Sequence, residues 1–196
     1  MTEPSLNTLR LHDLVDRFRD GDRAAADALL KAVAGQLGRL AGRMIRNFPK
    51  VRAGADTADV VQGAMIRLTK ALGDVRPNST REFAGLAALQ VRRELLDLAR
   101  YYTTRLIGRP VQDPKTDDFG TGGGDGPAEL ELWARFHAAA DALPAEEREA
   151  FGLLFYNGHT RAEAALLLGV SERTVYRWWA MACERLVEQL GGELPT

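Results

Sequence analysis

The chain has 196 residues, 45% of them hydrophobic and 27% charged, which suffices for one domain or two small ones and is typical of a soluble protein with a buried core. Its single cysteine excludes an intramolecular disulfide and favours the reducing cytoplasm. No apolar run approaches the roughly 20 residues of a membrane span, so we expect no membrane partner.

The net charge of −1 conceals an asymmetry: residues 1–111 carry 19 basic against 12 acidic side chains, and residues 112–150 carry 3 against 10. The basic part indicates either a nucleic-acid partner or an ordinary arginine-rich surface.

Apolar residues recur at helical spacing through most of the N-terminal part, and turn residues separate the runs. Gly21 and Asp22 separate the first run from the second, Pro49 stops the second, and Asp56 can cap the third. A short polar loop over residues 74–80 precedes the fourth run, whose opposite face is almost wholly polar. The predicted helices cover residues 11–18, 22–48, 56–72 and 83–102.

A segment rich in glycine, proline and aspartate, residues 108–126, separates this part from the rest of the chain. It has too few apolar residues to fold alone and is predicted to be a flexible linker. Helical spacing resumes with four further runs between Leu130 and Leu190, and no β pattern is present. The predicted fold class is all-α, with two small helical domains over residues 1–107 and 127–196 joined by the linker.

The segment from Thr160 to Trp179 has the spacing of a helix-turn-helix. Ala165 is small where two helices would cross, and Gly169 follows four residues later, where it can adopt the left-handed turn conformation. The second helix would present polar and basic side chains near its start, where a recognition helix meets base edges. These candidate DNA-binding residues are Ser171, Arg173, Thr174, Tyr176 and Arg177. The alternative is a helical hairpin that binds nothing.

Two adjacent tryptophans lie in the second helix of this motif. Trp179 shares a stripe with Val175 and is expected in the core, whereas for Trp178 both the core and the DNA-facing side are open. Neither His137 nor His159 has cysteine or carboxylate partners at metal-ligand spacing, and the glycine run lacks the lysine of a phosphate-binding loop. No pattern of nucleophile and base stands out. We predict that the protein is not an enzyme and needs no metal or other cofactor.

Several segments, taken in order, resemble the extracytoplasmic-function (ECF) sigma factors of bacterial RNA polymerase. Such proteins have a promoter-melting domain (region two), a linker and a helix-turn-helix domain (region four). The resemblance is carried by FRDGDRAA, DTADVVQ, the helix that begins REF, LPAEER and the helix-turn-helix, at residues 18–25, 56–62, 81–100, 143–148 and 158–179. Each motif is moderately specific, and their common order covers nearly the whole chain.

The resemblance implies a factor that binds core RNA polymerase and directs initiation at promoter DNA with minus-ten and minus-thirty-five elements, the latter read by the helix-turn-helix. It assigns polymerase binding to Asp56, Asp59, Val60 and Gln62. It assigns recognition of minus-ten DNA to Asn78, Ser79, Arg81, Arg92, Arg93 and Arg100. Considered alone, the two acids are equally consistent with a helix cap, and the arginines with a solvated helix face.

Two positions depart from the commonest family pattern. Gly63 stands where relatives usually have an acid, and Arg93 stands where many have an asparagine that reads a base. An anti-sigma factor or a regulatory kinase would be a further partner, and Thr57 is a candidate phosphorylation site in the polymerase-binding segment. The competing interpretations are a stand-alone helix-turn-helix regulator, which requires a sensor domain with strands, and a DNA-free adaptor, which leaves the basic recognition helix unexplained.

Overall fold

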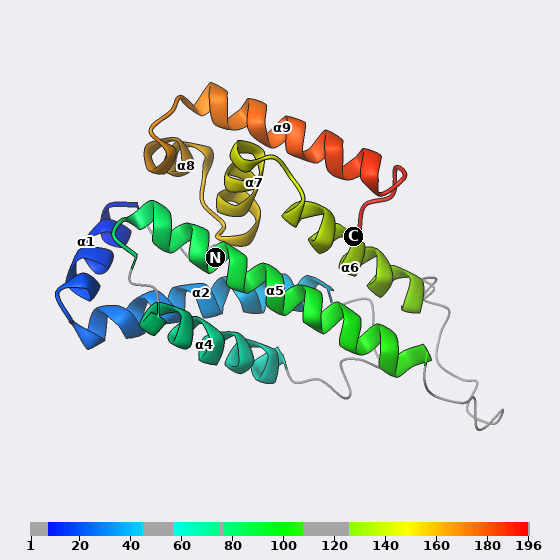
Figure 1. Ribbon diagram of the computed structural model, residues 1–196, viewed down its shortest axis with the longest axis horizontal. Coiled ribbons are helices and arrows are strands. Elements are labelled where there is room, and N and C mark those ends of the chain that lie inside the picture. Colours follow the sequence, from blue (N-terminus) through cyan, green and yellow to red (C-terminus); the bar gives the residue numbers. More distant parts are fainter. Residues whose placement is uncertain (1–7, 45–56, 75–76, 108–125, 196) are drawn as a thin grey trace.

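The computed structural model describes residues 8–44, 57–74, 77–107 and 126–195, and no strand occurs among them, as predicted (Figure 1). The N-terminal part contains α1 (Thr8–Arg19), α2 (Arg23–Met44), α4 (Thr57–Asp74) and α5 (Thr80–Ile107). The C-terminal part contains α6 (Gly126–Asp141), α7 (Ala145–Phe151), the π-helical turn η1 (Gly152–Tyr156), α8 (Arg161–Leu168) and α9 (Glu172–Gln189). All eight predicted helices are present, but residues 45–48 of the second, the predicted stop at Pro49 and the predicted cap at Asp56 lie outside the described residues. The π-helical turn is a feature that the sequence pattern does not predict. The predicted linker, except Gly126, lies outside the described residues.

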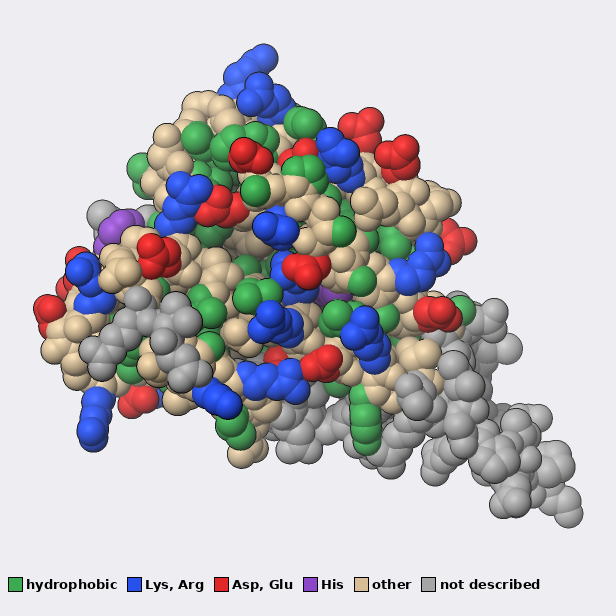
Figure 2. All heavy atoms as spheres, in the orientation of Figure 1, with side chains coloured by type: hydrophobic (Ala, Val, Ile, Leu, Met, Phe, Trp, Pro, Cys, Tyr) green, Lys and Arg blue, Asp and Glu red, His purple; other side chains and the backbone are tan. Residues whose placement is uncertain are grey.

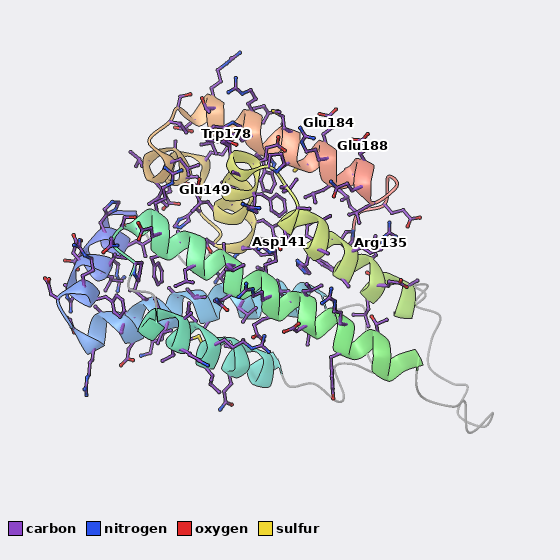
Figure 3. The ribbon with its side chains drawn as sticks, viewed as in Figure 1. Arg135, Asp141, Glu149, Trp178, Glu184 and Glu188 are labelled. Carbon is purple, nitrogen blue, oxygen red and sulfur yellow. The ribbon has the colours of Figure 1, made fainter. Side chains whose placement is uncertain are left out.

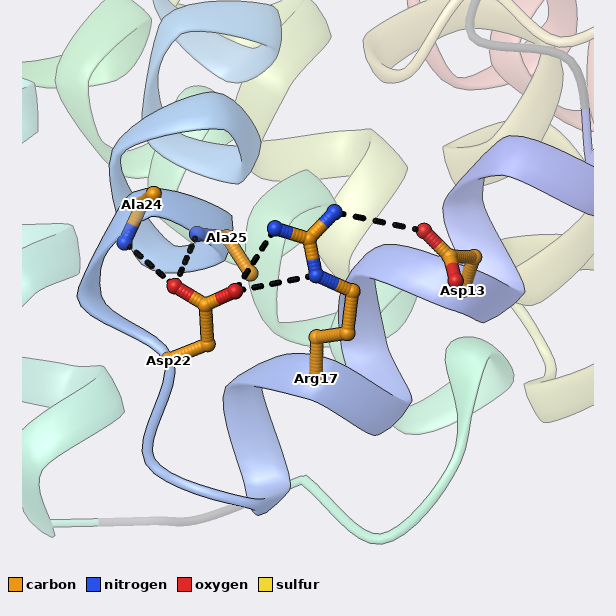
Figure 4. A network of polar contacts seen from close by, with 5 residues as sticks. All are labelled: Asp13, Arg17, Asp22, Ala24 and Ala25. Atoms are coloured by element: carbon orange, nitrogen blue, oxygen red, sulfur yellow. Dashed lines mark hydrogen bonds and ion pairs between the residues drawn. The ribbon is translucent and has the colours of Figure 1, made fainter.

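One carboxylate ties the end of α1 to the start of α2 (Figure 4). Asp22 Oδ1 accepts hydrogen bonds from the backbone N–H groups of Ala24 and Ala25, 2.8 and 3.3 Å long, as the predicted cap requires. Asp22 Oδ2 accepts two more from Arg17 of α1, at 2.9 and 2.6 Å, and Arg17 also pairs with Asp13. These hydrogen bonds, above all those from Arg17, hold the pKa of the Asp22 carboxyl below its ordinary value. The junction therefore prefers an ionised carboxylate.

The N-terminal helices enclose an apolar core where α1 and α2 meet α4 and α5. Apolar side chains three and four positions apart give each helix one face that is removed from water by packing. The buried members are Leu11, Leu14, Val15, Ala25, Leu29, Leu68, Leu72, Phe83 and Ala87. This core holds the end of α4 beside the start of α5.

The C-terminal helices form a second small core around the turn between α8 and α9. Its buried members are Ala84, Ala150, Leu153, Ala164, Ala165, Leu167, Leu168 and Val175. The buried carboxylate of Glu147 on α7 accepts a hydrogen bond from Arg185 of α9 at 2.9 Å, which ties these helices together. Because Ala84 belongs to α5, this core also connects the two parts of the chain.

The two parts pack against each other most extensively along α5 and α6, which lie side by side (Figure 1). A third and largest core lies between them. Its buried members are Leu37, Leu40, Ala41, Ala88, Val91, Leu95, Leu98, Ala99, Leu130, Trp133, Phe136, Ala140, Leu143, Phe151, Tyr156, Ala182, Leu186 and Leu190. The division into two domains stays a prediction. In this structure the two parts have apolar faces in common, and α6 covers one side of α5.

The turn η1 packs tightly against α5. A Cβ added to Gly152 would lie 3.2 Å from the Cβ of Ala88, so a side chain there would force the neighbour to shift by a few tenths of an ångström. The turn directs Tyr156 into the large core. The next residue, Asn157, donates its side-chain amide to the carbonyl oxygen of Ala84 at 2.8 Å. Glycine at position 152 therefore permits the close packing of the two parts.

Candidate nucleic-acid interface

The helices α8 and α9 and the turn between them have the geometry of the predicted helix-turn-helix. Thr160 Oγ1 accepts the backbone N–H of Glu163 at 3.3 Å, and the Glu163 carboxylate accepts the N–H of Thr160 at 2.8 Å, which caps α8. Gly169 ends α8 in the left-handed conformation, with a φ of 67°. Ser171 Oγ accepts the N–H of Thr174 at 3.1 Å and caps α9. Local hydrogen bonds therefore define where each helix of the motif begins.

The start of α9 presents a basic and aromatic face to solvent. Arg173, Tyr176 and Arg177 are exposed, and Tyr176 keeps 55% of its surface accessible. Thr174 is half-buried, and its hydroxyl lies 3.0 Å from that of Ser171. Three of the five predicted DNA-binding side chains thus lie on one exposed face of α9. The other two, Ser171 and Thr174, form the cap at the start of the helix.

Arg161, the first residue of α8, extends this face and is not among the predicted residues. It is exposed, and its guanidinium carbon lies 5.6 Å from the centre of the Tyr176 ring, within cation–π range. A basic residue directly after a helix cap is the available signal in the sequence. Only the packing of α8 against α9 reveals that it meets Tyr176.

The two tryptophans of α9 both contact the protein interior. Trp179 is half-buried and stacks on Phe151 of α7, with ring centres 5.1 Å apart and planes 12° from parallel. Trp178 is also half-buried and packs against the C-terminal core that contains Val175 (Figure 3). The sequence leaves Trp178 between core and DNA, and its packing assigns it to the edge of the core.

Asn78 and Ser79 directly precede α5 and organise its first turn. Ser79 Oγ accepts the backbone N–H of Glu82 at 3.1 Å, and the Glu82 carboxylate accepts the backbone N–H of Asn78 at 2.8 Å. Both residues are exposed. These two predicted minus-ten residues are therefore ordered by the helix cap and accessible from solvent.

Two of the predicted minus-ten arginines bind acids of the C-terminal part. Arg81 Nε and Nη2 donate to the two carboxylate oxygens of Glu149 on α7, at 2.6 and 2.7 Å. Arg92 is only 8% exposed and donates to the carboxylate of Asp141, the last residue of α6. Both acids lie on the side of α6 and α7 that meets α5 (Figure 3). In this arrangement Arg92 is withdrawn from solvent, and the two Arg81 nitrogens that donate to Glu149 are not available to a phosphate.

The other two predicted minus-ten arginines, Arg93 and Arg100, are exposed on α5. Between them, Asp97 accepts a hydrogen bond from Arg67 of α4 at 2.7 Å, and Arg67 also pairs with Glu94 at 2.8 Å. Burial raises the pKa of the Glu94 carboxyl, and the neighbouring Arg67 opposes that shift. The cluster joins α4 to α5, so that these helices and the exposed arginines form one unit.

The predicted polymerase-binding residues belong to the first turns of α4 and the segment before it. Gln62 is exposed; Asp59 and Val60 lie in the first turn, where the structure does not describe side chains, and Asp56 lies outside the described residues. One turn after Gln62, Ile66 is 64% exposed, and sequence reasoning misses it. An apolar residue four positions after Gln62 on the polar side of the helix is the available signal.

A groove of about 520 Å³ runs between α5 and the α6–α7 junction. Arginine and acidic side chains line it, namely Arg81, Arg92, Asp141, Arg148 and Glu149. Figure 2 shows basic and acidic side chains interspersed over this face of the molecule. Apolar side chains, among them Leu89 and Leu153, complete the lining, so the groove is a seam of mixed polar and apolar character between the two parts.

Within the described ranges, no group of three or more His, Cys, Asp and Glu side chains could hold a metal ion. The histidines considered from the sequence are buried: His137 Nδ1 hydrogen-bonds with the Tyr156 hydroxyl at 2.9 Å, and His159 lies between α8 and the N-terminal helices. Over the same ranges, no helix has the length and apolar character of a bilayer span.

Comparison with known proteins finds a family model that matches this chain and solved structures that are similar to it. The model of the family described as ECF sigma factor matches residues 9–192. The sigma factor RpoE, solved in complex with the anti-sigma factor NepR from Bartonella quintana, is similar at 20% sequence identity and a TM-score of 0.32. That similarity covers 84% of this chain and 92% of the other. Comparison with curated proteins finds no match.

Proposed function

Because this chain belongs to the ECF sigma factor family and directs transcription initiation with RNA polymerase, we propose that its two helical parts divide promoter recognition between them. Members of the family are not enzymes, so the work of this chain is binding: to core polymerase, to duplex DNA upstream and to an unpaired strand downstream. The observation that carries the proposal is the exposed basic face at the start of α9, on a helix-turn-helix whose two helices are capped at the turn.

The minus-thirty-five element is bound by α9 in the major groove. Arg173 and Arg177 can each donate two hydrogen bonds to a guanine, and Tyr176 offers an aromatic surface and a hydroxyl. Arg161, in contact with the Tyr176 ring, holds that ring in place and contributes a positive charge for the phosphate backbone. The hydroxyls of Ser171 and Thr174 cap the helix, which keeps its N-terminus ordered against the groove.

The minus-ten element is captured as an unpaired strand by the start of α5. Asn78 and Ser79 supply exposed polar groups for a base, while Arg93 and Arg100 supply positive charge along the same helix. Arg81 and Arg92 join this set once their acidic partners are removed. The order of these residues along one helix supports their binding of consecutive nucleotides.

Core polymerase is bound through the exposed face of α4. We assign this role to Asp59, Val60 and Gln62 in the first turns of α4, to Asp56 directly before α4 in the sequence, and to Ile66, which is exposed one helical turn after Gln62. Acids at a helix N-terminus are stabilised by the helix dipole and remain able to pair with a basic partner. Since RNA polymerase works in the cytoplasm, we place the protein there.

The direct test is run-off transcription with core polymerase, with and without this protein, on DNA from upstream of its own gene. We expect a defined transcript that requires the protein and is lost when Arg173 and Arg177 are both replaced by alanine. The control is Arg135→Ala, which removes one positive charge from an exposed position of α6 (Figure 3), and it is compared with Arg173→Ala and Arg177→Ala singly as well as with the double variant. Transcription that is independent of α9 would contradict the assignment of the minus-thirty-five contacts.

A further inference from the structure

We propose that the packed arrangement of the two parts is a self-inhibited state, in which Asp141 and Glu149 hold Arg92 and Arg81 and must release them before α5 can bind promoter DNA. The inference rests on the proposed role of these arginines in minus-ten recognition. What is new is that the C-terminal part competes with promoter DNA within the same chain. It occupies the strand-binding side of the N-terminal part until polymerase or DNA displaces it.

The pairing of Arg81 with Glu149 has the geometry that a nucleic-acid phosphate would require. Two nitrogens of one guanidinium donate to two oxygens of one anion, at 2.6 and 2.7 Å. Arginine binds carboxylate and phosphate with the same planar pair of donors. Glu149 therefore occupies the paired donors that a phosphate of the captured strand would use, and these two donors cannot bind both anions at once.

Arg92 is withdrawn from solvent as well as paired. It is 8% exposed, whereas the neighbouring Arg93 on the same helix is exposed. An arginine in such a position needs a charge partner, because an unpaired buried charge is strongly unfavourable. Asp141 is that partner, and α6 covers the guanidinium from the side. Arg92 can meet DNA only if α6 moves away from α5.

Uncharged contacts near η1 also join the two parts. Asn157 donates to the Ala84 carbonyl at 2.8 Å, and Gln36 of α2 donates to the Phe155 carbonyl at 3.2 Å. Each of these bonds joins a side chain of one part to the backbone of the other. The closed state is thus defined by specific hydrogen bonds at the end of η1, as well as by ion pairs and apolar burial.

The same interface contains features that favour its opening. The Nε1 of Trp133 and the Nε2 of His137 are buried without a hydrogen-bond partner among the described residues, and the two rings stack 5.5 Å apart. Each such group costs free energy for as long as it is kept from water. Asp141 and Arg81 lie at the exposed rim, where ion pairs contribute little and salt weakens them. These features make the interface less stable than its apolar burial alone would make it.

The test measures closure and DNA binding separately on the full chain. Spin labels at Lys70→Cys on α4 and Glu184→Cys on α9, in a Cys183→Ser background, report the distance between the parts. The variant Asp141→Asn with Glu149→Gln removes both acidic partners. The control variant Glu131→Gln with Glu146→Gln removes two charges from the same helices at exposed sites without ion pairs among the described residues.

For Asp141→Asn with Glu149→Gln we expect the ratio of open to closed molecules to rise about tenfold, while the control keeps the wild-type distances. Binding of a single-stranded oligonucleotide, carrying the non-template minus-ten sequence found by run-off transcription, should tighten by a similar factor without polymerase. The exchange variant Arg81→Glu with Glu149→Arg should keep the short, closed-state distance between the spin labels, since it forms the same ion pair with the charges reversed.

Distances that are the same in wild type and in Asp141→Asn with Glu149→Gln, at low and high salt, would overturn the inference. So would an opened chain that binds the oligonucleotide no better than wild type. A failure of the proposed function would give a different result. If Arg81→Ala and Arg92→Ala left oligonucleotide binding by the opened chain unchanged, these arginines would have no role in minus-ten recognition. That conclusion would hold whatever the distance between the spin labels.

Discussion

The Nδ1 of His137 on α6 lies 2.9 Å from the hydroxyl of Tyr156 at the end of η1, and both side chains are fully buried. Burial raises the pKa of Tyr156 and lowers the pKa of His137 to about 3, with the charge of Arg92 on α5 lowering both. The hydrogen bond thus lies inside the core common to the two parts, next to an arginine proposed to bind DNA. Protonation of His137 would place a second positive charge there.

The first prediction follows from the pKa of this histidine. Because the folded state binds a proton only near pH 3 and the unfolded chain binds it near the ordinary value of 6.5, stability is retained above about 6.5 and lost as the pH falls toward 3. Within that window His137 should lower the free energy of unfolding by about 1.4 kcal/mol per pH unit. Urea denaturation at pH 7, 6 and 5 measures this slope.

His137→Gln keeps a polar partner for Tyr156 and does not titrate, so it should flatten the slope. Burial also lowers the pKa of His159, so this residue too destabilises the protein as the pH falls. His137→Gln should therefore keep part of the pH dependence, and His137→Gln with His159→Gln should remove more of it. A slope equal to that of wild type in the double variant would contradict the prediction.

The second prediction concerns the recognition helix. Arg173→Ala or Arg177→Ala should cost about 1–3 kcal/mol of discrimination at one base pair if the side chain meets a guanine. If it meets phosphate, affinity should fall for all sequences and the salt dependence should become less steep. Holoenzyme binding to a set of substituted minus-thirty-five sequences separates the two. A variant that shows neither pattern would place its residue outside the interface.

The third prediction concerns the turn of the helix-turn-helix. Gly169 has a φ of 67°, which residues with a Cβ adopt at a cost, so Gly169→Ala should destabilise the protein by about 1 kcal/mol. Gly85 is an exposed glycine within α5 with nothing within 4 Å of an added Cβ. Gly85→Ala should therefore stabilise by about 0.5–1 kcal/mol. Thermal unfolding of both variants compares the same chemical change in opposite backbone contexts, and equal effects would show that the turn conformation is not limiting.

The fourth prediction concerns the face of α4. Asp56→Ala with Asp59→Ala should weaken association with core polymerase while changing unfolding free energy by at most about 1 kcal/mol, the value of one helix cap. Ile66→Ser should also weaken association, because the exposed side chain continues the face one turn beyond Gln62. Affinity for immobilised core polymerase measures both, and Lys31→Ala on α2 is the control for an exposed change elsewhere. Affinity equal to that of the control in both α4 variants would move the polymerase interface away from α4.

The features that proved predictable depend on residues close together in the chain. Asp22 caps α2 through N–H groups two and three positions ahead, and Ser171 caps α9 through the N–H of Thr174. Gly169 is required by its own backbone conformation. Such local preferences, added to the periodic spacing of apolar residues, determine where helices begin and which face of each is apolar. The all-α class and the helix-turn-helix could therefore be derived from the sequence.

The sequence by itself thus determined the helices, their caps and the presence of a basic recognition helix. Only the tertiary structure decided which faces meet: Arg81 is paired with a residue 68 positions away and Arg92 with one 49 positions away, and Trp178 lies against the C-terminal core. A basic side chain on a polar helix face gives the same local sequence pattern whether it binds a phosphate of DNA or a carboxylate that is distant in the chain. The difference arises from the packing of α6 and α7 on α5, which depends on apolar surfaces of the whole chain, and no local pattern records it.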